Sequence, residues 1–237
     1  MLQHTKRAAS KLVLSLLISL SFNAGALSAN LPSAQNLAAA HATLSPYQAQ
    51  IEQRMLEFAP FIGDVIKQLN QLGLPQSLAF IPMLESSLNP NAVSHANAKG
   101  IWQLMPATAK RFGLTVNQHR DERLDPKRST DAALQYLAFL YRKFDRDISL
   151  TLAAYNAGEG RLARAIGQGN TRKFSDLPLP SESRQYVSRF YVLNQLINLD
   201  KIKTAHFEPF QLFAAPSTMS TKPIIDLTPL KPLIQLD

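Results

Sequence analysis

The chain has 237 residues, 46% of them hydrophobic, which is enough for one ordinary domain with additional segments at its ends. It contains no cysteine, which excludes disulfides, thiolate metal sites and lipid attachment through cysteine. Its net charge of +8 favours polyanions in general, but no basic patch alternates with aromatic residues as in nucleic-acid-binding proteins. We therefore expect no nucleic-acid partner, and the charge by itself identifies no other partner.

The first 29 residues have the pattern of a cleavable export signal. Basic residues up to Lys11 precede an apolar run over residues 12–22, and small residues follow at positions 26, 28 and 29. A transmembrane anchor is the alternative, but it needs about 18 apolar residues or more, and this run is shorter. Removal of the signal would leave 22 basic and 17 acidic side chains. We expect an exported protein, soluble in the bacterial periplasm and without stable membrane insertion after cleavage.

Residues 30–45 are rich in alanine, serine and asparagine, and we interpret them as a loose linker. A helical pattern begins at Pro46. Apolar residues then recur at spacings of three and four between Ile62 and Leu72, which predicts a helix that Gly73 ends. We expect the folded domain to cover residues 46–205.

A second, short helix is predicted from Pro75. It must bend near Pro82, which lacks the N–H that the helical turn requires, and it places Glu85 near its end. A further helix is expected to begin at Pro106 and to end at Gly113.

Three longer helical segments follow. Asp125 and Pro126 have the pattern of an N-cap and a first helical position, and the apolar face of this helix reaches Phe144. Residues 149–157 predict a helix of small residues, and Ser181 is expected to cap the last long helix.

No segment alternates with period two for long enough to predict a sheet, although residues 94–100 could form a short β-hairpin. The expected fold is therefore all-α. After residue 205, five prolines interrupt any helical pattern. We interpret residues 206–237 as an extended, proline-rich tail.

Glu85 is the main candidate for chemistry. It lies among apolar residues, and two serines follow it directly. A carboxyl group in apolar surroundings has a raised pKa because desolvation disfavours its charged form. A carboxylic acid that is protonated at neutral pH can protonate the leaving oxygen of a glycosidic bond. The alternative is a solvated glutamate at a helix end.

Four short motifs are spread along the chain. They are Glu85-Ser86, GIWQLMPATA at residues 100–109, AAYNAGEG at 153–160 and ESRQYV at 182–187. In this order and spacing they resemble the peptidoglycan lytic transglycosylases with an SLT catalytic domain, and most closely the membrane-bound D-type murein transglycosylases. The resemblance covers about residues 74–199. It implies a single helical domain of the lysozyme-like α+β superfamily, with little or no sheet and a long substrate cleft.

The resemblance also implies a reaction. Enzymes of this family cleave the β-1,4 bond between N-acetylmuramic acid and N-acetylglucosamine without water, and they leave 1,6-anhydromuramoyl ends. Glu85 would act first as general acid on the leaving oxygen and then as general base on the muramoyl C6 hydroxyl. The expected partner is a peptidoglycan glycan strand, and no cofactor or metal is required.

Seven further positions match family residues around the reacting sugar. Tyr186 matches a tyrosine near the reacting centre. The positions that would line the sugar subsites are Ser94, Gln103, Met105, Tyr155, Asn156 and Glu182. Structural alternatives exist: Tyr186 could be a core aromatic, and Gln103 and Asn156 could cap backbone groups. Glu182 could instead complement the helix dipole.

Two positions depart from the family pattern. Asn97 stands where glycine is usual, and asparagine tolerates left-handed backbone geometry. Ser183 replaces the usual threonine and keeps the hydroxyl group. We expect neither change to remove activity.

Two other functions remain open. A hydrolytic muramidase of the lysozyme type would need a second carboxylate, with Glu182, Asp121 and Glu122 as candidates, at roughly 6.5–9.5 Å from Glu85 for an inverting route. An inactive murein-binding scaffold is the second alternative. The retention of Glu85, Gln103, Tyr155 and Tyr186 argues against it.

Overall fold

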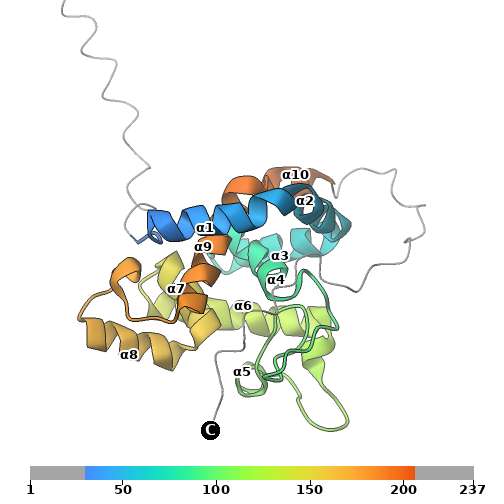
Figure 1. The fold of residues 1–237 in the computed structure, drawn as a ribbon. Helices are drawn as coiled ribbons and strands as arrows, with labels where there is room; N and C mark the ends of the chain where they lie inside the picture. Colours follow the sequence, from blue (N-terminus) through green and yellow to red (C-terminus); the bar gives the residue numbers. More distant parts are fainter. Residues whose placement is uncertain (1–29, 206–237) are drawn as a thin grey trace, which may run out of the picture.

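The computed structural model describes residues 30–205, and every structural statement below concerns that part of the chain. Its helices are α1 (Ala34–Leu44), α2 (Gln48–Glu57), α3 (Ala59–Gln71), α4 (Ile81–Ser86), α5 (Pro106–Arg111), α6 (Pro126–Lys143), α7 (Ile148–Ala157), α8 (Glu159–Gly169), α9 (Ser181–Leu196) and α10 (Leu199–Ala205). Short 3-10 turns connect some of them, at Ser45–Tyr47, Gln76–Phe80, Glu122–Leu124 and Phe174–Asp176. Figure 1 shows α1, α2 and α10 on one side of the molecule and α5 and α8 on the other.

The described residues contain no β-strand, so the prediction of an all-α fold is confirmed. Pairing of the extended type is limited to isolated bridges, two of which join Lys99 to Val93 and to Leu104. These bridges lie where a short hairpin was expected, and they close a small loop without forming a sheet.

The long helix α6 follows from local sequence rules. The carboxylate of Asp125 accepts hydrogen bonds from the backbone N–H groups of Lys127 and Arg128 at 2.9 and 3.0 Å, and Pro126 occupies the first turn. Leu134 and Leu137 are buried on its inner face. These are the cap and the apolar face that the sequence predicts.

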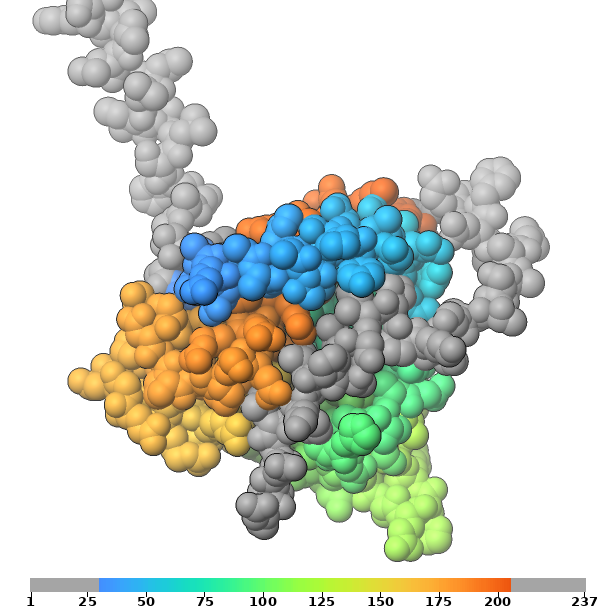
Figure 2. Space-filling model, viewed as in Figure 1, coloured from blue at the N-terminus to red at the C-terminus, as the bar shows by residue number. Residues whose placement is uncertain are grey.

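The sequence predicts a loose linker at residues 30–45, but the structure has helix α1 in this segment. Ser33 caps α1 by accepting a hydrogen bond from the N–H of Asn36 at 3.3 Å, and Ala40 and Leu44 are buried. The helix packs against α9, as Figures 1 and 2 show. An alanine-rich segment has high helix propensity, and α9 supplies the apolar surface that its few buried positions need. The folded domain therefore begins before residue 46.

The predicted bend near Pro82 is in fact a break between two elements. A 3-10 turn over Gln76–Phe80 ends, and α4 begins anew at Ile81 with Pro82 in its first turn. Proline fits a first turn because its missing N–H has no intrahelical partner there in any case. Gly73 and Gly113, the predicted helix ends, both have positive φ, at 65° and 87°.

Besides α1, two helices, α8 and α10, have no counterpart in the sequence prediction. Three glycines weaken the helical signal of α8, and only Leu162 and Ala165 are buried in it. The stripe of α9 also differs slightly from expectation, because Asn194 is exposed. The sequence predicts Ser181 as the N-cap of this helix, but Ser181 is the first helical residue and Pro180 occupies the N-cap position.

Within residues 30–205, no helix has both the length and the apolar character needed to cross a membrane. The expected signal at residues 1–29 and the expected tail at residues 206–237 lie outside the described residues. Both stay predictions.

Candidate active site

Glu85 lies in the last turn of α4, a helix of six residues whose other side chains are almost all buried. Its own side chain keeps partial exposure, while Met83 and Leu84 beside it are buried. Burial raises the pKa of the Glu85 carboxyl from 4.5 to about 7, and a hydrogen bond from Tyr186 opposes part of this rise. The carboxyl is therefore protonated in a large fraction of molecules at neutral pH.

Tyr186 is the direct partner of Glu85. Its hydroxyl donates a hydrogen bond of 2.7 Å to Glu85 Oε1 and joins α9 to α4 across 101 residues of sequence. Burial, and secondly the charge of Glu85, holds the pKa of Tyr186 well above its usual range. The phenol therefore stays protonated and remains a donor to the carboxylate.

Tyr155 approaches the same carboxyl from α7. Its hydroxyl donates to the backbone carbonyl of Trp102 at 2.8 Å, and Trp102 itself is fully buried. Burial raises the pKa of Tyr155 well above its usual value, and the neighbouring Glu85 charge raises it further. Three elements, α4, α7 and α9, thus bring one carboxyl and two phenols together.

The end of α4 has unusual backbone geometry. Ser87 and Leu88 both have left-handed φ values, 52° and 62°. Their N–H groups close the helix by donating to the carbonyls of Met83 and Pro82 at 3.0 and 3.1 Å. Left-handed non-glycine residues cost of order 1–3 kcal/mol each and persist only where surrounding contacts hold them.

Ser86 connects α4 to the motif at residues 100–109. Its hydroxyl donates to the carbonyls of Ile101 and Pro82 at 3.0 and 3.2 Å, and it accepts from the N–H of Asn89. The serine beside the candidate acid therefore fixes the position of α4 relative to this loop.

Gly100 is required by a close approach of two backbones. Its φ is +80°, and a Cβ added there would lie 1.8 Å from the carbonyl oxygen of Arg123. No side chain fits in that space. Asn97, the other departure from ordinary geometry in this loop, has a φ of 64°, as expected for the residue that replaces glycine.

Arg123 stabilises the loop at residues 97–104 through hydrogen bonds to its backbone carbonyls. Its guanidinium is buried and donates to the carbonyls of Asn97 and Leu104 at 2.6 and 3.1 Å. Two further hydrogen bonds, at 2.8 and 2.7 Å, pair it with both carboxylate oxygens of Asp121. This pairing lowers the pKa of Asp121 to about 2. Arg123 was not predicted as a site residue, since nothing in its local sequence distinguishes it from a surface arginine.

Gln103 and Ser94 serve the loop itself. The amide of Gln103 donates to the carbonyls of Ala92 and Gly100 at 3.1 and 2.8 Å, and its φ is 47°. The hydroxyl of Ser94 accepts from the N–H of Ala98 at 2.9 Å. For Gln103, the structure has the backbone-capping contacts that the alternative interpretation expects.

The remaining predicted subsite residues are less engaged. Asn156 Oδ1 is buried and has no hydrogen-bond donor within residues 30–205. Met105 is partly exposed at the position before α5, and Glu182 is partly exposed in the first turn of α9. Glu182 makes no ion pair within the described residues, so both of its interpretations stay open.

The other two candidate carboxylates are paired with cations. Asp121 contacts Lys99 at 3.1 Å in addition to Arg123. Glu122 is buried and accepts from the N–H of Thr115 at 2.6 Å, and its second oxygen contacts Arg120 at 2.7 Å. The Thr115 N–H is the main reason that the pKa of Glu122 is lowered. Both groups have structural roles that leave them poorly suited to activate water.

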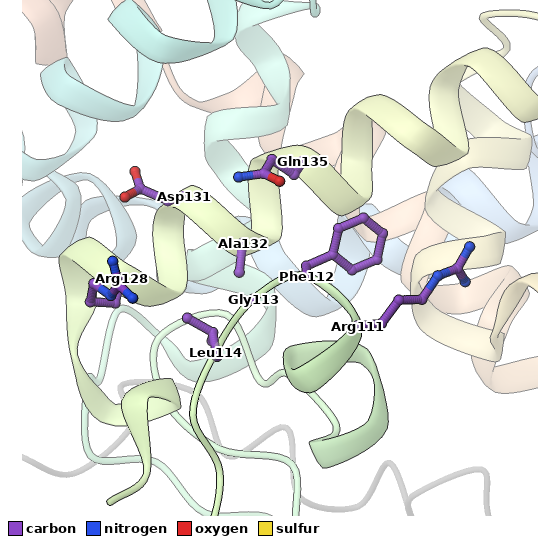
Figure 3. Close-up of a pocket in the computed structure, with 8 residues that line it drawn as sticks. All are labelled: Arg111, Phe112, Gly113, Leu114, Arg128, Asp131, Ala132 and Gln135. Atoms are coloured by element: carbon purple, nitrogen blue, oxygen red, sulfur yellow. The ribbon is translucent and has the colours of Figure 1, made fainter.

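An open hollow of about 430 Å³ lies elsewhere, between the end of α5 and the start of α6. Figure 3 shows Arg128 and Asp131 on α6, with Arg111 directed away from them. None of its lining residues belongs to the four motifs. No group of three potential metal ligands occurs in the described part of the chain.

Comparison with known proteins gives consistent matches. Residues 66–177 match the family described as Transglycosylase SLT domain. The chain is 39% identical over 150 residues to Membrane-bound lytic murein transglycosylase D of Escherichia coli strain K12, which covers 62% of this chain and 33% of that protein. It is 34% identical over 123 residues to the Soluble lytic murein transglycosylase of the same strain, covering 48% and 19%.

A solved structure agrees with the fold. The 70 kDa soluble lytic transglycosylase of Escherichia coli superposes with a TM-score of 0.51 and 25% sequence identity, over 63% of this chain and 29% of that one. The resemblance read from the four motifs is confirmed. The chain spans a third or less of the length of both curated relatives.

Proposed function

We propose that the chain is a lytic transglycosylase of peptidoglycan, because residues 66–177 match the Transglycosylase SLT domain family. It would cleave the β-1,4 bond between N-acetylmuramic acid and N-acetylglucosamine without water and leave 1,6-anhydromuramoyl ends. The observation that supports this most directly is the Glu85 carboxyl, which has a pKa of about 7 and lies 2.7 Å from the Tyr186 hydroxyl.

Glu85 carries both proton transfers. In the first step its proton goes to the glycosidic oxygen as the bond from C1 of the muramoyl sugar to that oxygen breaks. In the second step the resulting carboxylate takes the proton of the C6 hydroxyl, while the C6 oxygen forms a bond to C1. No water is consumed, and Glu85 ends in its starting protonated form. A pKa near the working pH suits a group that must both give and take a proton.

Tyr186 supports the charged form of Glu85 between the two steps. Its donated hydrogen bond lowers the pKa of the carboxyl and so favours the carboxylate. The attack comes from within one sugar, and the high effective molarity of such reactions makes a second catalytic carboxylate unnecessary. The pairing of Asp121 and Glu122 with cations agrees with this route.

The subsite residues are proposed from the motif match. They are Ser94, Gln103, Met105, Tyr155, Asn156 and Glu182. The buried Asn156 Oδ1 supports the proposal best, because a buried acceptor with no donor is costly unless a ligand group satisfies it. Export to the periplasm, with removal of residues 1–29, is part of the same proposal, since intact peptidoglycan lies outside the cytoplasm.

The reaction is tested by digestion of purified sacculi and mass spectrometry of the released muropeptides. We expect products with 1,6-anhydromuramic acid, each lighter by one water than its hydrolytic counterpart. Glycan that carries an O-acetyl group on the muramoyl C6 oxygen should resist, because the internal nucleophile is blocked. Reducing muramic ends, or undiminished cleavage of the acetylated glycan, would instead identify a hydrolase and make Glu182 the next residue to replace.

A further inference from the structure

Helix α2 carries a buried arginine on its apolar face. Arg54 lies between Ile51 and Met55 in the helical pattern and is 6% exposed, close to the values of its apolar neighbours. Arginine is almost never buried to this extent unless it is paired. Helix α2 precedes residues 66–177, so Arg54 lies outside the segment that matches the Transglycosylase SLT domain.

The guanidinium is held on three sides. Arg54 Nε donates to the backbone carbonyl of Ser87 at 3.1 Å, in a buried contact. Nη1 pairs with Glu57 at 3.1 Å, and the group lies 4.6 Å from the centre of the Phe58 ring. Only the contact with Ser87 leaves α2 and its immediate end, and it bridges 33 residues of sequence.

The Ser87 carbonyl belongs to the strained end of α4. The last carbonyls of a helix have no intrahelical donor, and a cation near them is favourable for the helix dipole. Ser87 is also the first of the two left-handed residues, which need external contacts to keep their geometry. Arg54 supplies such a contact two residues after Glu85.

We infer that Arg54 is a positioning residue for Glu85. Arg54 fixes the end of α4 and thereby the place of the Glu85 carboxyl beside the phenols on α7 and α9. Neither phenol that approaches Glu85 comes from α2: Tyr186 is on α9 and Tyr155 is on α7. Arg54 therefore acts through backbone geometry. The inference rests on the proposed function for its kinetic consequences, but the placement of Glu85 is measurable without activity.

The kinetic test compares Arg54→Met with Arg54→Lys. Methionine keeps an apolar stem but has no hydrogen-bond donor. Lysine keeps a cation and a donor but lacks the planar guanidinium group. We expect kcat on sacculi to fall about 10- to 100-fold for Arg54→Met, since a displacement of about 1 Å can cost 10²-fold, with KM nearly unchanged. Arg54→Lys should retain more activity. Where Arg54→Met does not fold, Arg54→Lys carries the test alone.

The pH profile separates positioning from simple loss of stability. A less tightly held Glu85 is more hydrated, so its pKa should fall from about 7 toward 4.5, and the alkaline limb of kcat/KM should move to lower pH. Leu134→Ala is the control, because it removes buried packing from α6 and leaves the hydrogen bonds of α4 to Arg54, Ile101 and Tyr186 in place. Its alkaline limb should stay in place.

The pKa of Glu85 is also measured by NMR titration of the glutamate side-chain carboxyl carbons, with Glu85→Gln for assignment. A lowered pKa in the Arg54 variants supports the inference even where the wild type proves to lack lytic activity, which would be a failure of the proposed function alone. An unchanged pKa and an unchanged kcat in folded Arg54→Met, or the same shifts in Leu134→Ala, would overturn it.

Discussion

Helices α4 and α6 are built by opposite means. Helix α6 has 18 residues, an Asp125 cap, a proline in its first turn and a regular buried face. Helix α4 has six residues, ends in left-handed geometry at Ser87 and Leu88, and carries a carboxyl whose pKa burial raises. One helix satisfies local rules throughout, and the other violates several of them within eight residues.

The difference locates stability and chemistry in separate parts of one domain. Contacts that hold α4 come from distant parts of the chain: Arg54 bonds to Ser87, Ile101 to Ser86 and Tyr186 to Glu85. Natural sequences break local rules mostly at functional sites, where surrounding structure compensates for the strain. We therefore expect substitutions in α4 to alter activity first and substitutions in α6 to alter stability first.

Glu85→Gln should produce the largest effect. The amide has the same shape but delivers no proton, so lytic activity on sacculi should fall by at least about 10²–10⁴-fold, the contribution of general acid–base catalysis. Circular dichroism of the variant should match the wild type. Release of muropeptides at the wild-type rate by a folded variant would remove Glu85 from the mechanism.

The same substitution should raise stability at neutral pH. The folded-state pKa of about 7 exceeds the ordinary value of 4.5, so the folded protein binds the Glu85 proton more tightly than the unfolded chain does. Stability is therefore lost as pH rises from 4.5 through 7, by up to about 3 kcal/mol. Urea unfolding at pH 4.5 and at pH 8 should show a smaller difference in Glu85→Gln than in the wild type.

Leu134→Ala tests the other side of the comparison. Leu134 is 1% exposed on α6, and the truncation should lower the free energy of unfolding by about 2–5 kcal/mol. Below the melting temperature, kcat per folded molecule should remain that of the wild type. The exposed Lys127→Ala on the same helix is the matched control and should change neither quantity.

Tyr186→Phe should change the acidity of the site while the fold stays intact. It removes the 2.7 Å hydrogen bond that lowers the Glu85 pKa, so that pKa should rise further, by about one to two units for a bond worth roughly 1.5–3 kcal/mol to a charged group. The alkaline limb of the pH profile should move upward, opposite to the direction expected for Arg54 variants. A limb that does not move would mean that the phenol is only a packing group.

Asp125→Ala should have the smallest effect. The carboxylate accepts two backbone hydrogen bonds at the start of α6, and loss of an N-cap costs about 0.5–2 kcal/mol. Thermal unfolding should show a small decrease, while product composition and pH profile should be those of the wild type. A changed pH profile would mean that α6 and the site are coupled more closely than the comparison implies.

The features that sequence predicts are those with local signals. The ends and inner face of α6 follow from Asp125, Pro126 and the spacing of the leucines, and the motif residues lead to Glu85. Helix α1 is missed because only two of its positions are buried, and they are buried by contact with α9, which is remote in sequence. The roles of Arg54 and Arg123 likewise depend on carbonyls that are remote in sequence, although the position of Arg54 on an apolar face was a usable signal.

The pairing of Glu85 with Tyr186 has a consequence for the timing of activity. Glu85 is synthesised about a hundred residues before Tyr186, and α1 is likewise synthesised well before α9, the helix against which it packs. A nascent chain that has only reached α8 contains Glu85 and Tyr155 but lacks the Tyr186 hydroxyl that donates to the carboxyl. We expect a chain that stops before Ser181 to release no muropeptides. Under the proposed function, activity on the cell wall therefore has to wait until α9 is synthesised and packed against α1 and α4.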